Sequence, residues 1–552
     1  MAIRPSLYWC RLLLSLCGIF LLVGLLPHVI PGSPLALYES WPSPASQRTF
    51  LINEYGLDRA VPVQYAIWLQ RTFTGHWGHS RFYHRPVFPE MLRATGFTLS
   101  LLLWVAAVCL VSMIGLWGLH RLFPPMRRAH AQLRLLTIAA VFPSFLVAIV
   151  VHDIAIWQVG WLRVATPLQF QPSHLLNPMA MLLPACVLAV SPLLVWYSCS
   201  AATSYHPAGV PDEPRLARQG GFCQLFHPLL GSFLLEVLLV EHVMALPGLG
   251  RLGIEALKRR DFPLVQGFIL LAGLLYLVLR LLCELRAGYA KRSVMHRLSS
   301  TVRPPLPNST RLWLYGGMWG VLVLLALAAW TAQLLPYDPT EIHRYDQLLR
   351  PGYRYVLGTD FLGRDVLSRT LQGFHSAIPR IFLLTILTGS IAWGGQWLAH
   401  QLSGPWRTAG TSLLALLNAL PPFLLAFMVF LVVEQHPRPL EITLAFACLP
   451  IAGQLMAYPT LFSRQCVQLS CLAAHMLFLH LIFLFLNLSP ESLTPTWGSD
   501  IRLGMHYNHI NMWLVIAPSL AFTWSRYIFQ YLGMYAALRT ADDAEGVVLE
   551  SS

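Results

Sequence analysis

Long apolar runs separated by short polar segments make up most of this chain. Twelve runs are long enough to cross about 30 Å of hydrocarbon as helices. They lie near 8–27, 97–119, 135–157, 178–200, 228–247, 267–285, 312–335, 377–400, 409–433, 440–461, 471–488 and 511–533. Lipid offers no hydrogen-bond partner to the backbone, so a helix is the open-ended structure that can span it. The pattern predicts an all-α polytopic membrane protein with about 12 transmembrane helices.

A basic segment at 286–311 divides the twelve runs into two sets of six. It carries six Lys or Arg residues and no acid, and its Pro-rich centre cannot continue a helix. Each half has a first span, a long loop (28–96 and 336–376) and five closer spans, which predicts a parallel repeat. The predicted domains are a first half at 1–285 (core about 97–285), the linker 286–311, a second half at 312–533 (core about 377–533) and a polar tail at 534–552.

The composition excludes a soluble globular protein, because 56% of the residues are hydrophobic and 11% are charged. Soluble proteins are roughly 25% charged. The net charge of +13 comes from basic residues scattered singly among apolar runs. Such scatter indicates contacts with membrane lipid and no nucleic-acid partner.

The distribution of basic residues also predicts the orientation. Loop 120–134 contains four arginines and no acid, like the 286–311 segment. The positive-inside rule then favours cytoplasmic termini and external loops at 28–96 and 336–376, although the cluster Lys258, Arg259 and Arg260 falls outside.

The segment LGTDFLGRDVLSR at 357–369 precedes the eighth predicted span. Gly358 and Gly363 allow tight turns, while Asp360, Arg364 and Asp365 offer charge-assisted hydrogen bonds that can fix a loop at the membrane surface. Because the basic residue can neutralise the carboxylates, we expect a structural element on the gate side and no catalytic or metal site.

Two acidic residues lie in one apolar run, Glu236 and Glu241. Five residues correspond to about 140° on a helix, so the two cannot form a carboxylate pair on one face. We expect Glu241 to be structural, as a cap or a snorkelling residue, and not a proton carrier. The sequence also lacks HExxH and a Walker lysine loop, so an enzyme is not predicted and ATP hydrolysis requires separate subunits.

The 357–369 segment resembles the one before the permease core in the second inner-membrane subunit of oligopeptide, dipeptide and nickel ABC importers. The first half resembles the partner subunit of these importers. The segments that carry this resemblance, in the family's order, are PGSP at 31–34, YGLDRAVPVQYAIWL at 55–69, GHWGHS at 75–80, RPV at 85–87, FPSF at 142–145, PGLGRL at 247–252 and RDFPLVQG at 260–267. The chain thus resembles both permease subunits fused head to tail.

The resemblance implies a multi-pass protein of the bacterial inner membrane, with two six-helix permease halves. It implies two ABC ATPase subunits that carry ATP and Mg, an extracytoplasmic solute-binding protein and a peptide-like solute. It implies no cofactor in this chain. The segment RLARQGGFCQLFH at 215–227 is similar to the family's ATPase-coupling loop, with Ala217 and Gly221 at matching positions and Arg215 and Arg218 as surface contacts.

Three alternatives stay open at this point. The 215–227 segment can be a basic loop that binds acidic headgroups. The second-half counterpart, SRQCVQLSCLAAH at 463–475, is short, so a scaffold or sensor without ATPase coupling is one alternative function. An ion-coupled secondary transporter, also built from two halves, is the other.

Overall fold

The computed structural model describes residues 5–31, 35, 45–122, 143–157, 178–203, 229–294, 323, 335–401, 420–455, 462–488 and 494–530. These residues are mostly helical, and among them the only β pairing is two isolated bridges. The chain divides into two compact units. The first contains residues 1–302 and 419–424, and the second contains residues 303–418 and 425–552.

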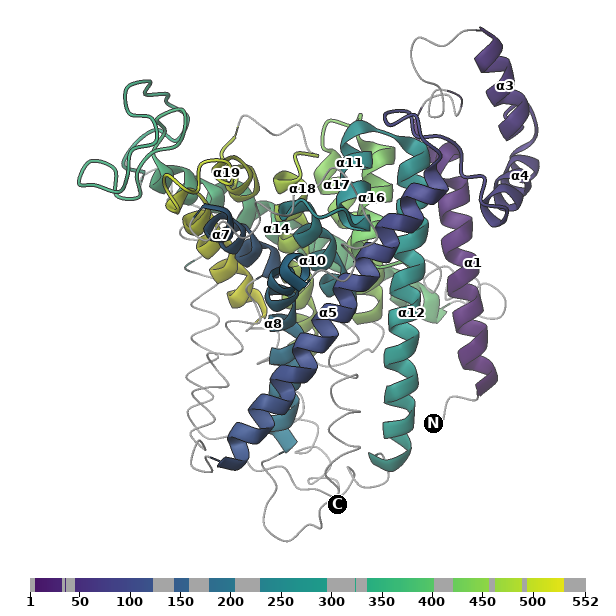
Figure 1. The fold of residues 1–552 in the computed structure, drawn as a ribbon, viewed down its shortest axis with the longest axis horizontal. Coiled ribbons are helices and arrows are strands. Elements are labelled where there is room, and N and C mark those ends of the chain that lie inside the picture. The colour runs from purple at the N-terminus through teal and green to yellow at the C-terminus, as the bar shows by residue number, and fades with distance from the viewer. Residues whose placement is uncertain are drawn as a thin grey trace. The chain divides into compact units, whose positions relative to one another are not determined.

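The first unit contains nine described helices, of which α5 and α12 are the longest. They are α1 (Pro5–Val29), α3 (Ala45–Tyr55), α4 (Val61–Phe73), α5 (Val87–Leu122), α7 (Ser144–Trp157), α8 (Pro178–Thr203), α10 (Leu230–Val243), α11 (Leu249–Arg259) and α12 (Phe262–Val294). Helix α12 packs against α1, α5 and α11, and α5 packs against α8 (Figure 1).

The second unit is built around α14 (Val366–Gln401), which packs against α17 (Pro439–Leu455) and α18 (Phe462–Phe485). Helix α18 also contacts the short α19 (Trp497–Gly504). Helix α16 (Pro422–Val433) begins in the segment that is grouped with the first unit. A last helical stretch covers 513–530.

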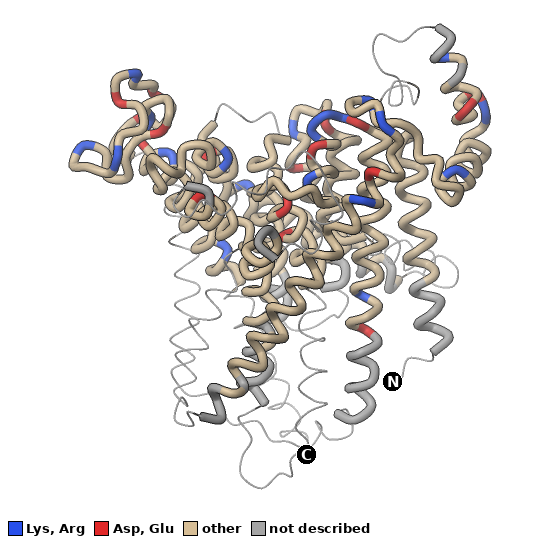
Figure 2. Tube along the Cα trace, in the orientation of Figure 1, with Lys and Arg blue, Asp and Glu red and all other residues tan. Residues whose placement is uncertain are grey.

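Apolar length supports membrane insertion. Within the described ranges, three helices are long and apolar enough to cross a membrane: Val87–Leu116, Phe262–Glu284 and Val366–Gly395. Six shorter apolar helices lie in other predicted runs: Leu13–Val29, Ser144–Ala155, Met181–Leu194, Pro422–Val433, Pro439–Ala452 and Leu469–Phe485. The predicted span 312–335 lies almost entirely outside the described residues. Figure 2 shows that Lys, Arg, Asp and Glu gather mainly in segments outside the apolar helices. The chain is therefore a multi-pass membrane protein, and the number of spans stays a prediction.

Three helices extend beyond the apolar runs from which the spans were predicted. Helix α5 begins at Val87 and not near 97, and α14 begins at Val366 and not near 377. Helix α12 continues to Val294, into the segment predicted as a linker. Polar residues in these terminal turns lower the local hydropathy, although the backbone is already helical. The proposed domain boundaries stay predictions.

Candidate functional site

Residues 357–365 form a tight turn directly before α14. The N–H of Asp360 donates to the carbonyl of Arg364 at 3.0 Å, and the N–H of Val366 donates to the carbonyl of Gly358 at 3.1 Å. An isolated antiparallel bridge pairs Thr359 with Asp365. The structure thus brings together all five residues predicted for this motif: Gly358, Asp360, Gly363, Arg364 and Asp365.

The carboxylate of Asp360 holds the turn together from inside. Its Oδ1 accepts the N–H groups of Leu362 at 2.8 Å and Arg364 at 2.9 Å. Its Oδ2 accepts from Nε of Arg364 at 2.7 Å. Asp360 is buried, and charge-assisted bonds of this kind are the strong ones.

The two glycines of the turn have the left-handed backbone that favours glycine, each with φ of +79°. A Cβ at Gly363 would lie 1.9 Å from the carbonyl oxygen of His343, and one at Gly358 would lie 2.2 Å from that of Leu349. Both the conformation and the close approach of segment 343–349 therefore require glycine.

Asp365 caps the N-terminus of α14. Its Oδ2 accepts from the N–H of Ser368 at 2.8 Å and from the Ser368 hydroxyl at 2.7 Å. A carboxylate that accepts from the third residue of a helix satisfies one of its free N–H groups. This cap is the physical reason why α14 begins at Val366.

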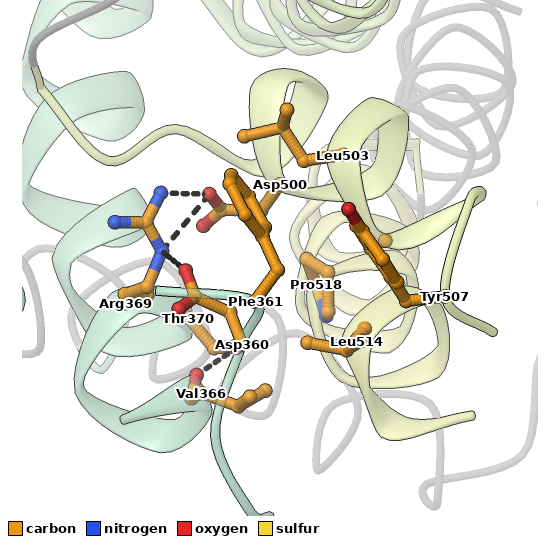
Figure 3. Close-up of a pocket in the computed structure, with 11 residues that line it drawn as sticks. Asp360, Phe361, Val366, Arg369, Thr370, Asp500, Leu503, Tyr507, Leu514 and Pro518 are labelled. Atoms are coloured by element: carbon orange, nitrogen blue, oxygen red, sulfur yellow. Dashed lines mark hydrogen bonds and ion pairs between the residues drawn. The ribbon is translucent and has the colours of Figure 1, made fainter. Parts of the chain in front are cut away.

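Arg369, in the first turn of α14, connects the turn to α19. Its Nε donates to Oδ1 of Asp500 at 3.1 Å, its Nη2 donates to the same oxygen, and its Nε lies 3.8 Å from Oδ2 of Asp360 (Figure 3). Its Nη1 donates to the carbonyl of Pro339 at 3.1 Å. Burial raises the pKa of Asp500, and the Arg369 charge opposes this shift.

Arg369 and Asp500 are site residues that the sequence pattern does not predict. Arg369 lies inside the 357–369 segment, and Asp500 follows the PTWG segment at 495–498. The two residues are 131 positions apart in the sequence, and only the tertiary fold pairs their charges.

Beside these charges lies a small cavity that is too small for a peptide-like solute. Its volume is about 20 Å³, close to the room needed by one water molecule. Figure 3 shows Phe361 between the charged group and Tyr507, and the Phe361 and Tyr507 rings stack with centroids 5.4 Å apart. Among the described residues, no group of three or more His, Cys, Asp or Glu side chains could hold a metal ion. The site is a packed contact between the 357–365 turn, α14 and α19, and it does not have the form of a solute pocket.

A turn with the same hydrogen bonds precedes α5 in the first unit. The N–H of Val87 donates to the carbonyl of Gly78 at 3.0 Å, and the N–H of Ser80 donates to that of Arg85 at 2.9 Å. The Ser80 hydroxyl donates to Oδ2 of Asp261, directly before α12, at 2.5 Å. A turn with this hydrogen-bond pattern therefore lies directly before α5 in the first unit and directly before α14 in the second unit.

Tyr83 in this turn binds Glu255 in α11, with a 2.6 Å hydrogen bond from its hydroxyl to Oε2. Burial, followed by the bond to Glu255, raises the pKa of Tyr83 to about 12. Burial alone would raise the pKa of Glu255, but the bonds from Tyr83 and Arg251 outweigh it and lower that pKa.

Glu241 is fully buried and serves as a structural cap, as predicted, and the absence of a proton-carrying role stays a prediction. Its Oε1 accepts from the Thr98 hydroxyl at 2.6 Å, and its Oε2 accepts from the N–H of Gly250 in the first turn of α11 at 2.7 Å. The hydroxyl oxygen of Thr98 also accepts from the N–H of Leu249 at 2.9 Å. Glu241 and Thr98 together satisfy the N-terminus of α11.

The predicted coupling residues Arg215, Ala217, Arg218 and Gly221 lie outside the described residues. The second-half counterpart, 463–475, is part of the helix α18.

No protein-family model matches the chain. Among curated proteins, it is 28% identical over 306 residues to the Sinorhizobium fredii protein named "Probable peptide ABC transporter permease protein y4tP", a match that covers 51% of this chain and 96% of that protein. It is 26% identical over 325 residues to the dipeptide transport system permease protein DppB of Escherichia coli, covering 51% of this chain and 95% of that protein. Each match thus takes in almost a whole relative and about half of this chain.

Proposed function

We propose that this chain, which is homologous over about half its length to permease subunits of peptide ABC transporters, forms the membrane path of an ATP-driven importer of peptides or similar small solutes. The observation that carries the proposal is the length of the match, which spans 95–96% of a permease subunit within 51% of this chain. The recurrence of one turn-and-helix arrangement in both units supports a second permease half in the remainder.

The other components of the importer are separate proteins. An extracytoplasmic solute-binding protein delivers a peptide-like solute, and two ABC ATPase subunits bind ATP with Mg and hydrolyse it. The chain lies in the bacterial inner membrane with both termini in the cytoplasm. Residues Arg215, Ala217, Arg218 and Gly221 contact one ATPase subunit.

The 357–365 turn serves as an external gate element in this scheme. Asp360 fixes the turn, Asp365 fixes the start of α14, and Arg369 binds α19 through Asp500. Because these buried hydrogen bonds link the turn to α14 and α14 to α19, we expect the three segments to move together. A binding protein that pushes on the external turn would therefore displace α14 and α19 together.

An ion-coupled secondary transporter is the alternative function. It would use a buried carboxylate such as that of Glu241 to carry the ion. Both oxygens of that carboxylate accept hydrogen bonds at the N-terminus of α11 and from Thr98. This engagement fits a structural role and favours the ABC permease.

Purification of the tagged full-length chain from its native membrane in mild detergent tests the proposal. We expect two copies of an ABC ATPase subunit to co-purify with each chain. Charge reversal at Arg215 and Arg218 should reduce this recovery more than the same change at Arg464, because only the first half has a recognisable coupling loop. A chain that is recovered without any nucleotide-binding subunit would instead support the secondary transporter or the scaffold.

Labelling of single cysteines at Ser46 and Ser299 in intact cells tests the orientation. A membrane-impermeant reagent should label the cysteine at 46, and labelling only at 299 would reverse the topology.

A further inference from the structure

Helix α4 lies at the surface of the first unit, and none of its residues, all of which the structure describes, is buried. One side of the helix is bonded to the preceding segment. Nε2 of Gln64 donates to the carbonyl of Arg59 at 2.7 Å, and Nη2 of Arg71 binds Oε1 of Glu54 at 2.6 Å. This side carries the polar contacts of the helix.

A second side of α4 packs on α1 (Figure 1). A Cβ at Gly24 of α1 would lie 2.7 Å from the rings of Tyr65 and Trp68, so these rings press against the α1 backbone. The ring of Phe73 stacks on Phe20 of α1, with centroids 5.4 Å apart and planes 19° apart.

The third side of α4 is an apolar stripe. Pro62, Ala66, Leu69 and Phe73 have the spacing i, i+4, i+7 and i+11, which places them in one row along a helix. Phe73 is 73% exposed, Pro62 and Ala66 are exposed, and Leu69 is half-buried.

The contact with α1 gives the depth of this stripe in the membrane. Helix α1 has 25 residues, which at 1.5 Å per residue is about 37 Å, or about 7 Å longer than a typical hydrocarbon core. If all of these ~7 Å of α1 extended beyond the hydrocarbon at the Val29 end, the hydrocarbon boundary would still fall near Gly24, about five residues before that end. Phe20, on which Phe73 stacks, is then below the boundary, and Leu21, the next residue of α1, is 37% exposed.

We propose that α4 is an interfacial helix whose Pro62–Ala66–Leu69–Phe73 stripe inserts among the phospholipid acyl chains of the leaflet at the Val29 end of α1. Amphipathic helices of this kind lie in the membrane plane with their apolar face at the boundary of headgroups and acyl chains. The occupant of the stripe is lipid because the stripe continues the exposed surface of α1 at hydrocarbon depth. The inserted helix anchors the segment 45–73 to the membrane surface.

Photo-cross-linking in lipid vesicles tests the proposal on the full-length chain. The amino acid p-benzoylphenylalanine, which is close in shape to phenylalanine, is introduced at Phe73 and, in a second variant, at Ala66. Leu103, which lies inside the long apolar helix α5 and is 72% exposed, is the positive control for lipid contact. Tyr353, a fully exposed aromatic residue in a polar segment, is the matched negative control. Phosphatidylcholine adducts are measured by mass spectrometry of the purified chain.

We expect the adduct yield at Phe73 and at Ala66 to be about ten-fold above that at Tyr353 and similar to that at Leu103. A yield at both positions equal to that at Tyr353 would overturn the proposal. Cross-links from both positions mainly to a second copy of the chain, or to the binding protein when it is added, would also overturn it. The measurement needs neither ATP nor solute, so its outcome is independent of whether the chain works as an importer.

Discussion

The guanidinium of Arg369 binds the carboxylate of Asp500 across 131 residues of sequence, and it is the contact that ties the start of α14 to α19. The two side chains are only 8% and 10% exposed. Removal of one partner from a buried ion pair leaves the other charge uncompensated, at a cost of about 3–5 kcal/mol.

Asp500→Ala should therefore lower the free energy of unfolding by about 3 kcal/mol, because Arg369 then keeps the carbonyl of Pro339 and only one carboxylate, the more distant Asp360. Asp500→Asn should cost less, since its amide oxygen can still accept. Thermal unfolding in detergent measures both effects, with the exposed Glu341→Gln as the control. In a double-mutant cycle with Arg369→Gln, the double variant should lose clearly less than the sum of the single losses. Additive losses would show that the two residues do not interact.

Gly363→Val should be among the most damaging single changes in the 357–365 turn. The positive φ strains any β-branched residue by about 1–2 kcal/mol, and the new Cβ would collide with the His343 carbonyl. Asp360→Asn should do less harm, because the amide oxygen can still accept from Leu362 and Arg364. Gly394→Ala is the matched control, since a Cβ there meets nothing within 4 Å, and it should be neutral or slightly stabilising. The three variants are compared by their yield of folded protein and their melting temperature. Equal yields and melting temperatures for Gly363→Val and Gly394→Ala would contradict the geometry of the turn.

Glu241→Gln separates a structural carboxylate from a proton carrier. The amide oxygen can accept from Gly250, and the amide nitrogen can donate to the Thr98 hydroxyl oxygen, so we expect a loss of less than about 1 kcal/mol and intact transport. Glu241→Ala leaves the N-terminus of α11 without this acceptor and should cost about 2–3 kcal/mol. Melting curves and solute uptake are measured together. Stable Glu241→Gln protein that has lost uptake would indicate that the proton on this side chain is used in transport.

The contact between Tyr83 and Glu255 should weaken in acid. The folded-state pKa of Glu255 is lowered, so its contribution to stability is present above its unfolded pKa of about 4.3 and is lost as the pH falls through the folded value. The difference in melting temperature between wild type and Glu255→Gln should therefore stay constant from about pH 7 to about pH 5 and shrink below about pH 4.3. Glu90→Gln, which removes only 3.5 Å ion pairs at the surface, should show a small difference at every pH. A Glu255→Gln difference that grows in acid would have the wrong sign.

The sequence predicted helix positions well where hydropathy alone decides them. The run 8–27 lies within α1, and the run 178–200 lies within α8, because both are apolar almost to their ends. It failed where polar residues occupy the first turn of a helix. Arg369 and Ser368 lower the hydropathy of α14 before residue 377, yet the Asp365 cap already starts the helix at Val366.

The candidate site was predictable in its local part only. Glycines and charges within nine residues of one another indicate a turn, and Gly358, Gly363 and Asp360 do form one. No periodic pattern connects Arg369 to Asp500, because their proximity depends on how α18 and α19 pack on α14.

The proposed importer function is tested most directly by ATP hydrolysis in vesicles that contain this chain together with the proposed ATPase subunits. We expect the solute-loaded binding protein, added on the side of the membrane where the 357–365 turn lies, to raise the hydrolysis rate several-fold over the empty binding protein. A rate that is the same with loaded, empty and no binding protein would show that the chain does not transmit the docking signal and would contradict its function as an importer permease.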